Sequence, residues 1–373
     1  MGSATPADYS IPDEARDLFR RGILDNPLMT NLPSDLQDLG KLVHFEGNAT
    51  PSIPINWRLA ESISSLKAFE ATLVNAILKR KYGVDPVNVT INTPFGPDEH
   101  PTTESFHRML ATGIYKTRDG RFYHIHGKCF FGGAYPLGLP LEGEPEDTYE
   151  AAVERIQNKV LGFDAPALDD LMNRQYRQAG TTVFSADEYL ATEHAQANAK
   201  VGLYEVIRDA NSSQPAGWWP ENSSLPSGPK RPLAGLKVVD LTRVIAGPTI
   251  TRGLAELGAS VMRVVSPHVV DWPRAFHDLN WGKWNTFLHL KDEGDKKKLE
   301  KLILDADVVV DGYRPGVMDR LGFGREAIFE LVRNRDRGII HLRENCYGWH
   351  GDWATRSGWQ GISDAVSLRS APL

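Results

Sequence analysis

Residues 232–265 constrain the fold most strongly, because they contain a complete strand, helix and second strand. The run LKVVDLT is short and apolar, which is typical of a buried parallel strand, and TITRGLAELG has the spacing of an amphipathic helix that ends at Gly258. The second strand is SVMRVV. Two parallel strands joined by a helix form a βαβ unit, whose helix lies on one face of a sheet. An α/β domain is therefore predicted from residue 232 onward.

The alternation of strands and helices continues to the end of the chain. A helix over DKKKLEKLILDA precedes the apolar run DVVVDGY, and a helix near residues 326–335 precedes RGIIHLREN. This order predicts an open, mostly parallel, doubly wound sheet of the Rossmann-like type. Such sheets bind ligands at the carboxyl ends of their strands, where loops meet helix N-termini. Residues 243–248 and 312–316 are the loops at those positions.

The first part of the chain has a different composition. Residues 1–54 are polar and rich in proline, with one helical stretch near residues 14–22, and are expected to form an extended N-terminal arm. Residues 57–82 have apolar side chains at helical spacing, and Gly83 follows them, so a long helix with one buried face is predicted. The apolar positions of that face are Leu59, Ile63, Leu66, Phe69, Leu73, Ile77 and Leu78.

A second, smaller α+β domain is predicted within residues 55–210. The stretch GIYKTRDGRFYHIHG indicates a hairpin that turns at Asp119-Gly120. Helices are expected over residues 148–161 and 165–178, and Ser185 with Glu188 has the spacing of a capping box. Residues 211–231 are rich in Ser, Pro, Gly and Asn and are expected to be a linker. The Rossmann-like domain would then occupy residues 232–373.

Composition excludes several classes of function. The formal charge of -6 offers no general attraction for nucleic acid. Cys129 and Cys346 lack metal-ligand spacing, so neither a zinc site nor a disulfide framework is indicated. His124 and His126 share one face of a predicted strand, a pattern more typical of a half-buried sheet than of a metal site. The sequence lacks a signal peptide and a run of about 18 apolar residues, so a cytoplasmic protein without membrane contact or bound metal is expected.

Four segments of the second half resemble, in order, the motifs of the family III CoA-transferases. They are PLAGLKVVDLTRVIAGPTITRGLAELGASVMRV, LNWGKWNTFLHLK, DADVVVDGYRPGVMDRLGFG and ENCYGWHGDWATRSGWQGISDA. Residues 53–207 resemble the family segment that normally follows the active site. The order is thus permuted, as in large fungal members that carry two such halves in tandem. The resemblance implies a homodimer that acts on an acyl-CoA and a small carboxylic acid or specialised metabolite, as in fungal secondary metabolism.

The resemblance also implies coenzyme A or an acyl-CoA as the ligand. Arginine and lysine near helix N-termini suit its phosphates, and Tyr313 suits its adenine ring. The residues alone allow simpler roles, since Gly247 and Pro248 can shape a turn, Lys283 can be a surface cation and Arg320 can pair with Asp319. The positions that match the family's CoA contacts are Arg243, Val244, Ile245, Ala246, Gly247, Lys283, Tyr313 and Arg320.

The catalytic step of the resembled family depends on one acidic residue. In the resembled transferases an aspartate attacks the thioester and forms a covalent intermediate. The resemblance places that aspartate beyond GWQGISDA, and the sequence ends at Leu373 with VSLRSAPL in place of the expected continuation. Asp364 is the nearest carboxylate, with a polar contact at a helix start as its alternative role. Two hypotheses therefore stand, namely a CoA-transferase and a catalytically inactive CoA-binding or partner-binding protein without the nucleophile segment. In the related racemases a histidine lies in the stretch that contains Trp359 here, so the resemblance does not supply the proton-transfer pair of a racemase either.

Overall fold

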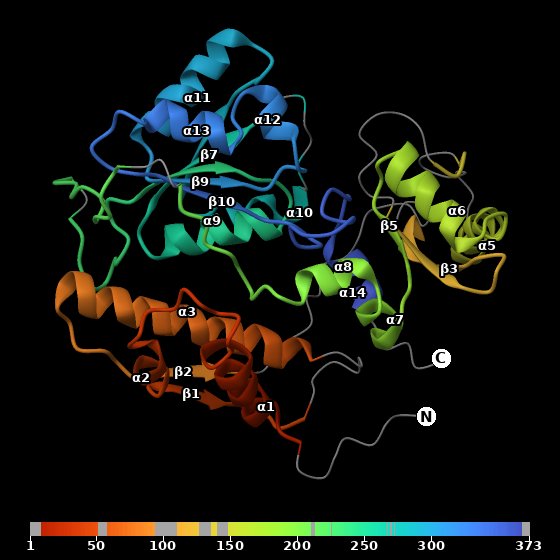
Figure 1. Cartoon of the computed structure of the whole chain (residues 1–373), viewed down its shortest axis with the longest axis horizontal. Coiled ribbons are helices and arrows are strands. Elements are labelled where there is room, and N and C mark those ends of the chain that lie inside the picture. The colour runs from red at the N-terminus through yellow and green to blue at the C-terminus, as the bar shows by residue number, and fades with distance from the viewer. Residues whose placement is uncertain are drawn as a thin grey trace.

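The computed structural model describes residues 9–50, 58–93, 110–126, 136–139, 148–209, 213–224, 226–266, 268, 271 and 273–367. Parts of the predicted arm and linker, Cys129 and the last residues of the chain lie outside this set. Figure 1 shows a five-stranded sheet with helices above and below it, an N-terminal unit beneath, and a smaller antiparallel sheet to one side.

The predicted parallel sheet is confirmed. Its strand order is β10-β9-β6-β7-β8, and every neighbouring pair is parallel. The strands are β6 (Lys237–Leu241), β7 (Ser260–Val265), β8 (Lys283–Phe287), β9 (Val308–Asp311) and β10 (Ile340–Arg343). Within this sheet, the chain first forms the central strand β6 and then β7 and β8 on one side of it. It then crosses over to form β9 and β10 on the other side. The strand order therefore reverses between β6 and β9, which is the position where sheets of this kind bind ligands.

Helices cover both faces of this sheet, so the fold is doubly wound. The helices α11 (Glu293–Asp305), α12 (Val317–Leu321) and α13 (Arg325–Val332) lie on one face, and α9 (Ala246–Glu256) lies on the other (Figure 1). Short helices α10 (Pro273–Phe276) and η3 (Asp278–Asn280) precede β8. β9 is buried along its whole length because its Val-Val-Val run has a helix layer on each side.

The smaller α+β unit has the predicted antiparallel hairpin. Strands β3 (Thr112–Lys116) and β4 (Phe122–His126) pair around a turn in which Gly120 has φ of 80°, and β5 (Gly180–Thr182) pairs with β4. Helices α5 (Tyr149–Val160) and α6 (Ala165–Asp170), the latter continued by the π-helical turn η2 (Leu171–Gln175), cover this sheet. The predicted capping box of Ser185 is present at α7 (Ala186–Leu190), which α8 (Glu193–Asn198) follows.

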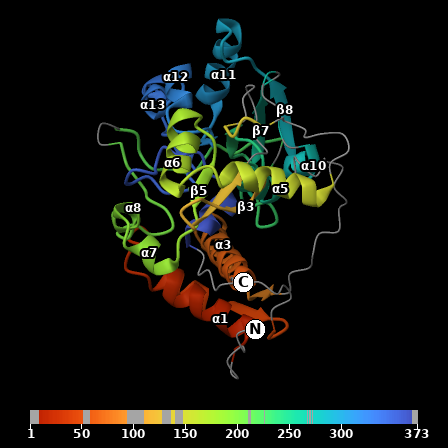
Figure 2. The ribbon, with the colours of Figure 1, turned by 90° about the vertical axis from the view of Figure 1, so that its right-hand side faces the viewer.

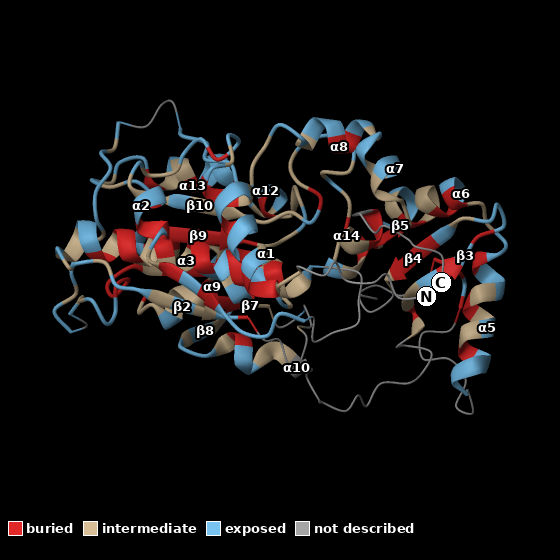
Figure 3. Ribbon diagram, turned by 90° about the horizontal axis from the view of Figure 1, so that it is seen from below, coloured by how far each residue is buried: buried red, intermediate tan, exposed pale blue. Residues whose placement is uncertain are grey.

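The end of the described chain belongs spatially to this smaller unit. Helix α14 (Gln360–Ser367) lies against β4 and β5, and the carbonyl of Gly361 is 2.8 Å from His124 Nδ1. The Rossmann-like domain was expected to extend over residues 232–373, but α14 packs on the smaller unit and not on the parallel sheet. Figure 3, seen from below, shows α14 beside β4 and β5, coloured mainly as intermediate or buried.

The expectation of an extended N-terminal arm is wrong for the described residues 9–50. They form α1 (Ile11–Asp17), the π-helical turn η1 (Leu18–Leu24), α2 (Leu36–Gly40) and β1 (Val43–Glu46). β1 pairs in parallel with β2 (Val89–Asn92), and α3 (Leu59–Tyr82) connects the two strands. Phe19 and Leu36 are buried in the shared core. The high proline content was misleading because proline is compatible with the first turn of a helix, where Pro12 stands in α1.

The long helix is confirmed as α3, which Gly83 ends with φ of 63°, but its buried face was predicted only in part, since Phe69 and Leu78 are buried and other positions are not. Ile63 and Leu66 are exposed at 38% and 49%. The buried positions are mostly small or polar, as with Ala68 and Thr72, because α1 and α2 pack closely against this helix. Figure 2, turned from the view of Figure 1, shows α1 crossing α3.

The described residues between 213 and 231 contain no helix, and Trp219 anchors them. The indole Nε1 donates a hydrogen bond of 2.8 Å to the carbonyl of Ala234, and Lys81 Nζ lies 3.7 Å from the ring centroid. Across the described part of the chain, no helix combines the length and the apolar content needed to cross a bilayer.

Candidate functional site

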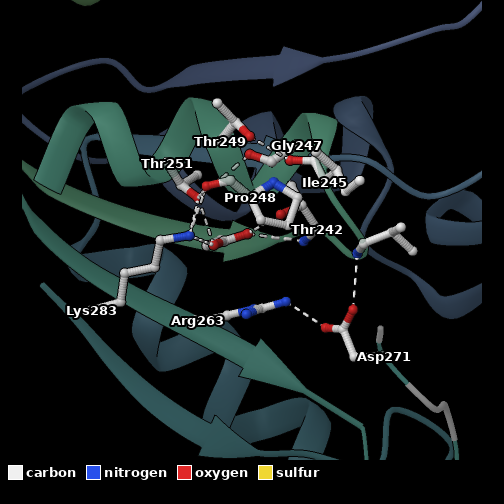
Figure 4. Close-up of polar contacts among 11 residues, drawn as sticks. Thr242, Ile245, Gly247, Pro248, Thr249, Thr251, Arg263, Asp271 and Lys283 are labelled. Atoms are coloured by element: carbon white, nitrogen blue, oxygen red, sulfur yellow. Dashed lines mark hydrogen bonds and ion pairs between the residues drawn. The ribbon is translucent and has the colours of Figure 1, made fainter. Parts of the chain in front are cut away.

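The loop after β6 is built on one buried carboxylate, Asp240. Its Oδ1 accepts hydrogen bonds from the backbone N–H of Thr242 at 3.0 Å and from the hydroxyl of that threonine at 2.5 Å. Its Oδ2 accepts from the Thr251 hydroxyl at 2.6 Å and from Lys283 Nζ at 3.1 Å (Figure 4). One carboxylate thus joins the end of β6, the first turns of α9 and the start of β8, which fixes where the loop leaves the sheet.

Lys283 lies inside the protein and not at its surface. Its side chain is 0% exposed, and the ammonium donates to Asp240, to the Thr251 hydroxyl at 2.7 Å and to the carbonyl of Pro248 at 2.9 Å. Burial lowers the pKa of Lys283, and the adjacent Asp240 partly counteracts this. The surface-cation alternative is therefore wrong. Because an ammonium has three protons and all three have acceptors here, a direct phosphate contact would require this network to open.

Exposure increases along the loop that leads from Thr242 to the N-terminus of α9. Ile245 and Ala246 are exposed, Arg243 and Val244 are half-buried, and Gly247 is buried. Ile245 is the N-cap and supplies no side-chain acceptor to the helix. The N-terminus of a helix as long as α9 favours a bound anion, because the positive end of the helix dipole lies there.

Val244 has an unusual backbone conformation, with φ of 69°. A β-branched side chain in this left-handed region is strained. The Val244 N–H donates a hydrogen bond of 2.9 Å to Asp271 Oδ1, and Asp271 Oδ2 accepts from Arg263 of β7 (Figure 4).

The loop after β9 lies at the same edge of the sheet. Asp311 Oδ1 accepts from the N–H of Tyr313 at 2.9 Å, and burial raises the pKa of Asp311 to about 6. Tyr313 packs against the core, and burial raises the pKa of its hydroxyl, whereas the nearby Arg243 opposes that rise. Arg320 is exposed on α12, one turn after Gly316.

Glu344 was not identified from the sequence, yet it lies where the strand order reverses. It follows β10, and its carboxyl lies near the Gly247 backbone, which partly opposes the rise in its pKa. A Cβ on Gly247 would lie 3.0 Å from its Oε1, and one on Gly312 would lie 2.7 Å away, so glycine at both positions leaves room for the carboxyl. Burial, with Asp311 and Asp240 nearby, raises the pKa of Glu344 to about 7. A carboxylate two positions after the run IIHL, at the end of a predicted strand, was the available signal.

The structure therefore brings together only part of the predicted set. Residues 243–247 and Tyr313 meet at the carboxyl edge of the sheet, whereas the ammonium of Lys283 lies beneath α9. Asp364 lies within α14, and its Oδ1 accepts from Gln360 Nε2 at 2.7 Å, one turn earlier in that helix. The ring of His126 stacks on Trp359 at 5.2 Å between centroids. Among the residues described, no group of three or more His, Cys, Asp or Glu is arranged to hold a metal ion.

Comparisons with known proteins agree with the resemblance. The model of CoA-transferase family III matches residues 233–368. The chain is 57% identical, over 96% of its length and 66% of the relative's, to acetyl-coenzyme A transferase nodX of Hypoxylon pulicicidum. It is 38% identical, over 69% of its length and 45% of the relative's, to an acyl-CoA transferase of Gibberella moniliformis. The chain thus spans less than two thirds of either curated relative.

A solved CAIB/BAIF family protein from Brucella suis is 28% identical, with a TM-score of 0.32, over 36% of this chain and 38% of that one. The fold assignment rests on the strand order and helix layers described above.

Proposed function

This chain belongs to CoA-transferase family III, and from that premise we propose that it binds coenzyme A or an acyl-CoA at the carboxyl edge of its parallel sheet. The match over residues 233–368 carries the proposal, because it includes all five strands and both candidate loops. The ligand would enter where the strand order reverses, between the loops after β6 and β9.

Charge and shape at this edge support a CoA thioester. Arg243 and Arg320 provide guanidinium groups for the phosphates of the nucleotide end, and the exposed N-terminus of α9 provides backbone donors. Tyr313 offers an aromatic face for the adenine. The ammonium of Lys283 would act indirectly, by holding Asp240 and thereby the loop, unless its network opens on binding.

We further propose that the reaction is an acyl-CoA dependent transfer to a small carboxylic acid or specialised metabolite. The name of the fungal relative, acetyl-coenzyme A transferase, favours acetyl-CoA as the donor. We also propose that the protein is a homodimer and that it lies in the cytoplasm.

Calorimetry with coenzyme A tests the binding proposal. Arg243→Ala should weaken CoA binding by about 1 to 3 kcal/mol, the value for a hydrogen bond to a charged group, and added salt should weaken it further. Lys297→Ala is the matched control, because Lys297 is an exposed cation of α11. Absence of binding heat at millimolar coenzyme A would refute the proposal, and so would equal affinities of the Arg243 and Lys297 variants.

The transfer is tested by incubation with radiolabelled acetyl-CoA and a series of small carboxylic acids. Labelled products that require both the protein and the acid would support it. The transferase proposal would be contradicted if the protein binds coenzyme A tightly but transfers no label to any acid. The same test is repeated with the segments of the relatives that this chain does not span added as a separate polypeptide.

A further inference from the structure

Asp271 joins two parts of the candidate site that are otherwise separate. One carboxylate oxygen accepts the Val244 N–H of the loop after β6 at 2.9 Å, and the other accepts from the guanidinium of Arg263 on β7. The side chain of Asp271 is 12% exposed and that of Arg263 is 1% exposed. This bridge therefore lies almost entirely inside the protein.

Arg263 depends on Asp271 for its charge balance. Within the described residues, Nε and Nη1 of Arg263 are buried and have no hydrogen-bond partner, and the guanidinium carbon lies 4.7 Å from the ring centroid of Phe276. Asp240 lies beside Arg263 in the sheet register, but its oxygens are engaged by two threonines and Lys283. The ion pair with Asp271 thus compensates a buried cation whose position the sheet determines.

Asp271 also contacts Val244, whose backbone conformation is strained. The φ of 69° at Val244 is one that valine disfavours, and only two non-glycine residues among those described have positive φ. The hydrogen bond from the Val244 N–H acts at the strained residue itself. The strained residue is followed directly by Ile245 and by the first turn of α9, so its conformation sets the direction of the helix N-terminus.

We propose that Asp271 is a positioning residue for the CoA site, which uses the buried charge of Arg263 as a fixed anchor and holds Val244 in the left-handed conformation that aims the N-terminus of α9. The consequence for CoA affinity rests on the function proposed above. The effect on the loop does not, because it follows from the hydrogen bond and the backbone angle alone.

This role differs measurably from that of a merely stabilising ion pair. Loss of Asp271 removes, among its contacts, the partner of Arg263 and the hydrogen bond to Val244. Glycine adopts φ of about 69° without steric cost, so Val244→Gly makes that hydrogen bond unnecessary but does nothing for Arg263. A second-site glycine should therefore restore the loop and leave the loss of stability uncorrected.

The experiment is a double-mutant cycle of Asp271→Ala and Val244→Gly with three measurements. They are urea unfolding, hydrogen exchange of the peptide that contains residues 242–249, and calorimetric affinity for coenzyme A. We expect Asp271→Ala alone to weaken CoA binding about tenfold or more, equivalent to about 1.4 kcal/mol, and to raise exchange in that peptide. In the V244G background both changes should fall below about threefold, while the loss of stability persists.

Asp271→Asn separates the two contributions and also serves if the alanine variant does not fold. The amide oxygen still accepts the Val244 N–H, so the loop should stay protected, whereas the charge balance of Arg263 is lost and stability falls. Asp278→Ala, at an exposed acid nearby in η3, and Val87→Gly, at an exposed valine, are the matched controls.

Equal effects of Asp271→Ala on hydrogen exchange in the wild-type and V244G backgrounds would overturn the inference. So would restoration of stability together with exchange, since that would indicate a purely structural pair. If the wild-type protein does not bind coenzyme A, the proposed function fails, and the exchange measurements still decide the role of Asp271.

Discussion

Replacement of Glu344 by glutamine should make the protein more stable at alkaline pH, although a buried polar contact is being altered. Glutamine keeps an oxygen that can face the Gly247 backbone, has nearly the same shape, and cannot ionise. Glu344 itself has a pKa raised to about 7 by burial and by its acidic neighbours, from an ordinary value of 4.5. The groups that face it are Asp311, which Arg343 approaches at 3.8 Å, Asp240, which Lys283 neutralises, and the thiol of Cys346.

The sign of the effect follows from proton counting. Between about pH 4.5 and pH 7 the folded protein retains a proton that the unfolded chain has released, so stability falls as pH rises through this range. Above about pH 7 the whole penalty is present. The difference between the ordinary and the raised pKa of Glu344 corresponds to about 3 kcal/mol, at about 1.36 kcal/mol for each pKa unit. Because Glu344 is only half-buried, solvent screening reduces the expected penalty to about 1 to 2 kcal/mol.

Urea unfolding of the wild type and Glu344→Gln at about pH 5 and about pH 8 measures this penalty. The variant should match the wild type or be slightly less stable at the lower pH and exceed it by about 1 to 2 kcal/mol at the higher one. Glu300→Gln, at an exposed position of α11, is the control and should change neither value by more than about 0.5 kcal/mol. Asp311 also titrates in this range, so the quantity to compare is the difference between variant and wild type.

Parallel stability profiles of the two proteins across this pH range would refute the reasoning, because they would show that Glu344 ionises freely in the folded state. A Glu344→Gln variant that is less stable than the wild type at about pH 8 would refute it as well, since the ionised carboxylate of Glu344 would then stabilise the fold.

Two further predictions concern the core of the site and its assembly. Lys283→Ala should lower stability by about 3 to 5 kcal/mol in urea unfolding, because it leaves Asp240 as an uncompensated buried charge, and Lys283→Met combined with Asp240→Asn should cost less than the single change. A cost of Lys283→Ala below about 1 kcal/mol would contradict this account. Light scattering should give twice the mass of one chain if the protein is the proposed homodimer, and the mass of one chain at every concentration would exclude it.

The sequence by itself determined the elements whose signals are local. Alternating apolar runs and amphipathic segments predicted the strands β6, β7, β9 and β10 and the helices between them, because periodicity reports which faces can be buried. The turn at Gly120, the capping box at Ser185 and the end of α3 at Gly83 were equally readable, since each depends on neighbouring residues. The loops 243–248 and 312–316 followed from the rule that ligands meet parallel sheets at their carboxyl ends, whereas the individual CoA contacts predicted in them came from the family resemblance.

Only the tertiary structure determines which charged side chains pair with one another across these elements. Lys283 and Asp240 are 43 residues apart, and nothing near either one shows that they form a pair at 0% exposure. The bridge of Asp271 and the position of Glu344 between Gly247 and Gly312 likewise depend on strands brought together from distant parts of the chain. The folding of residues 9–50 was missed for the same reason, because their core forms only where α3 supplies the opposite surface. A pattern along the chain specifies an element, whereas burial and charge compensation depend on which elements pack together.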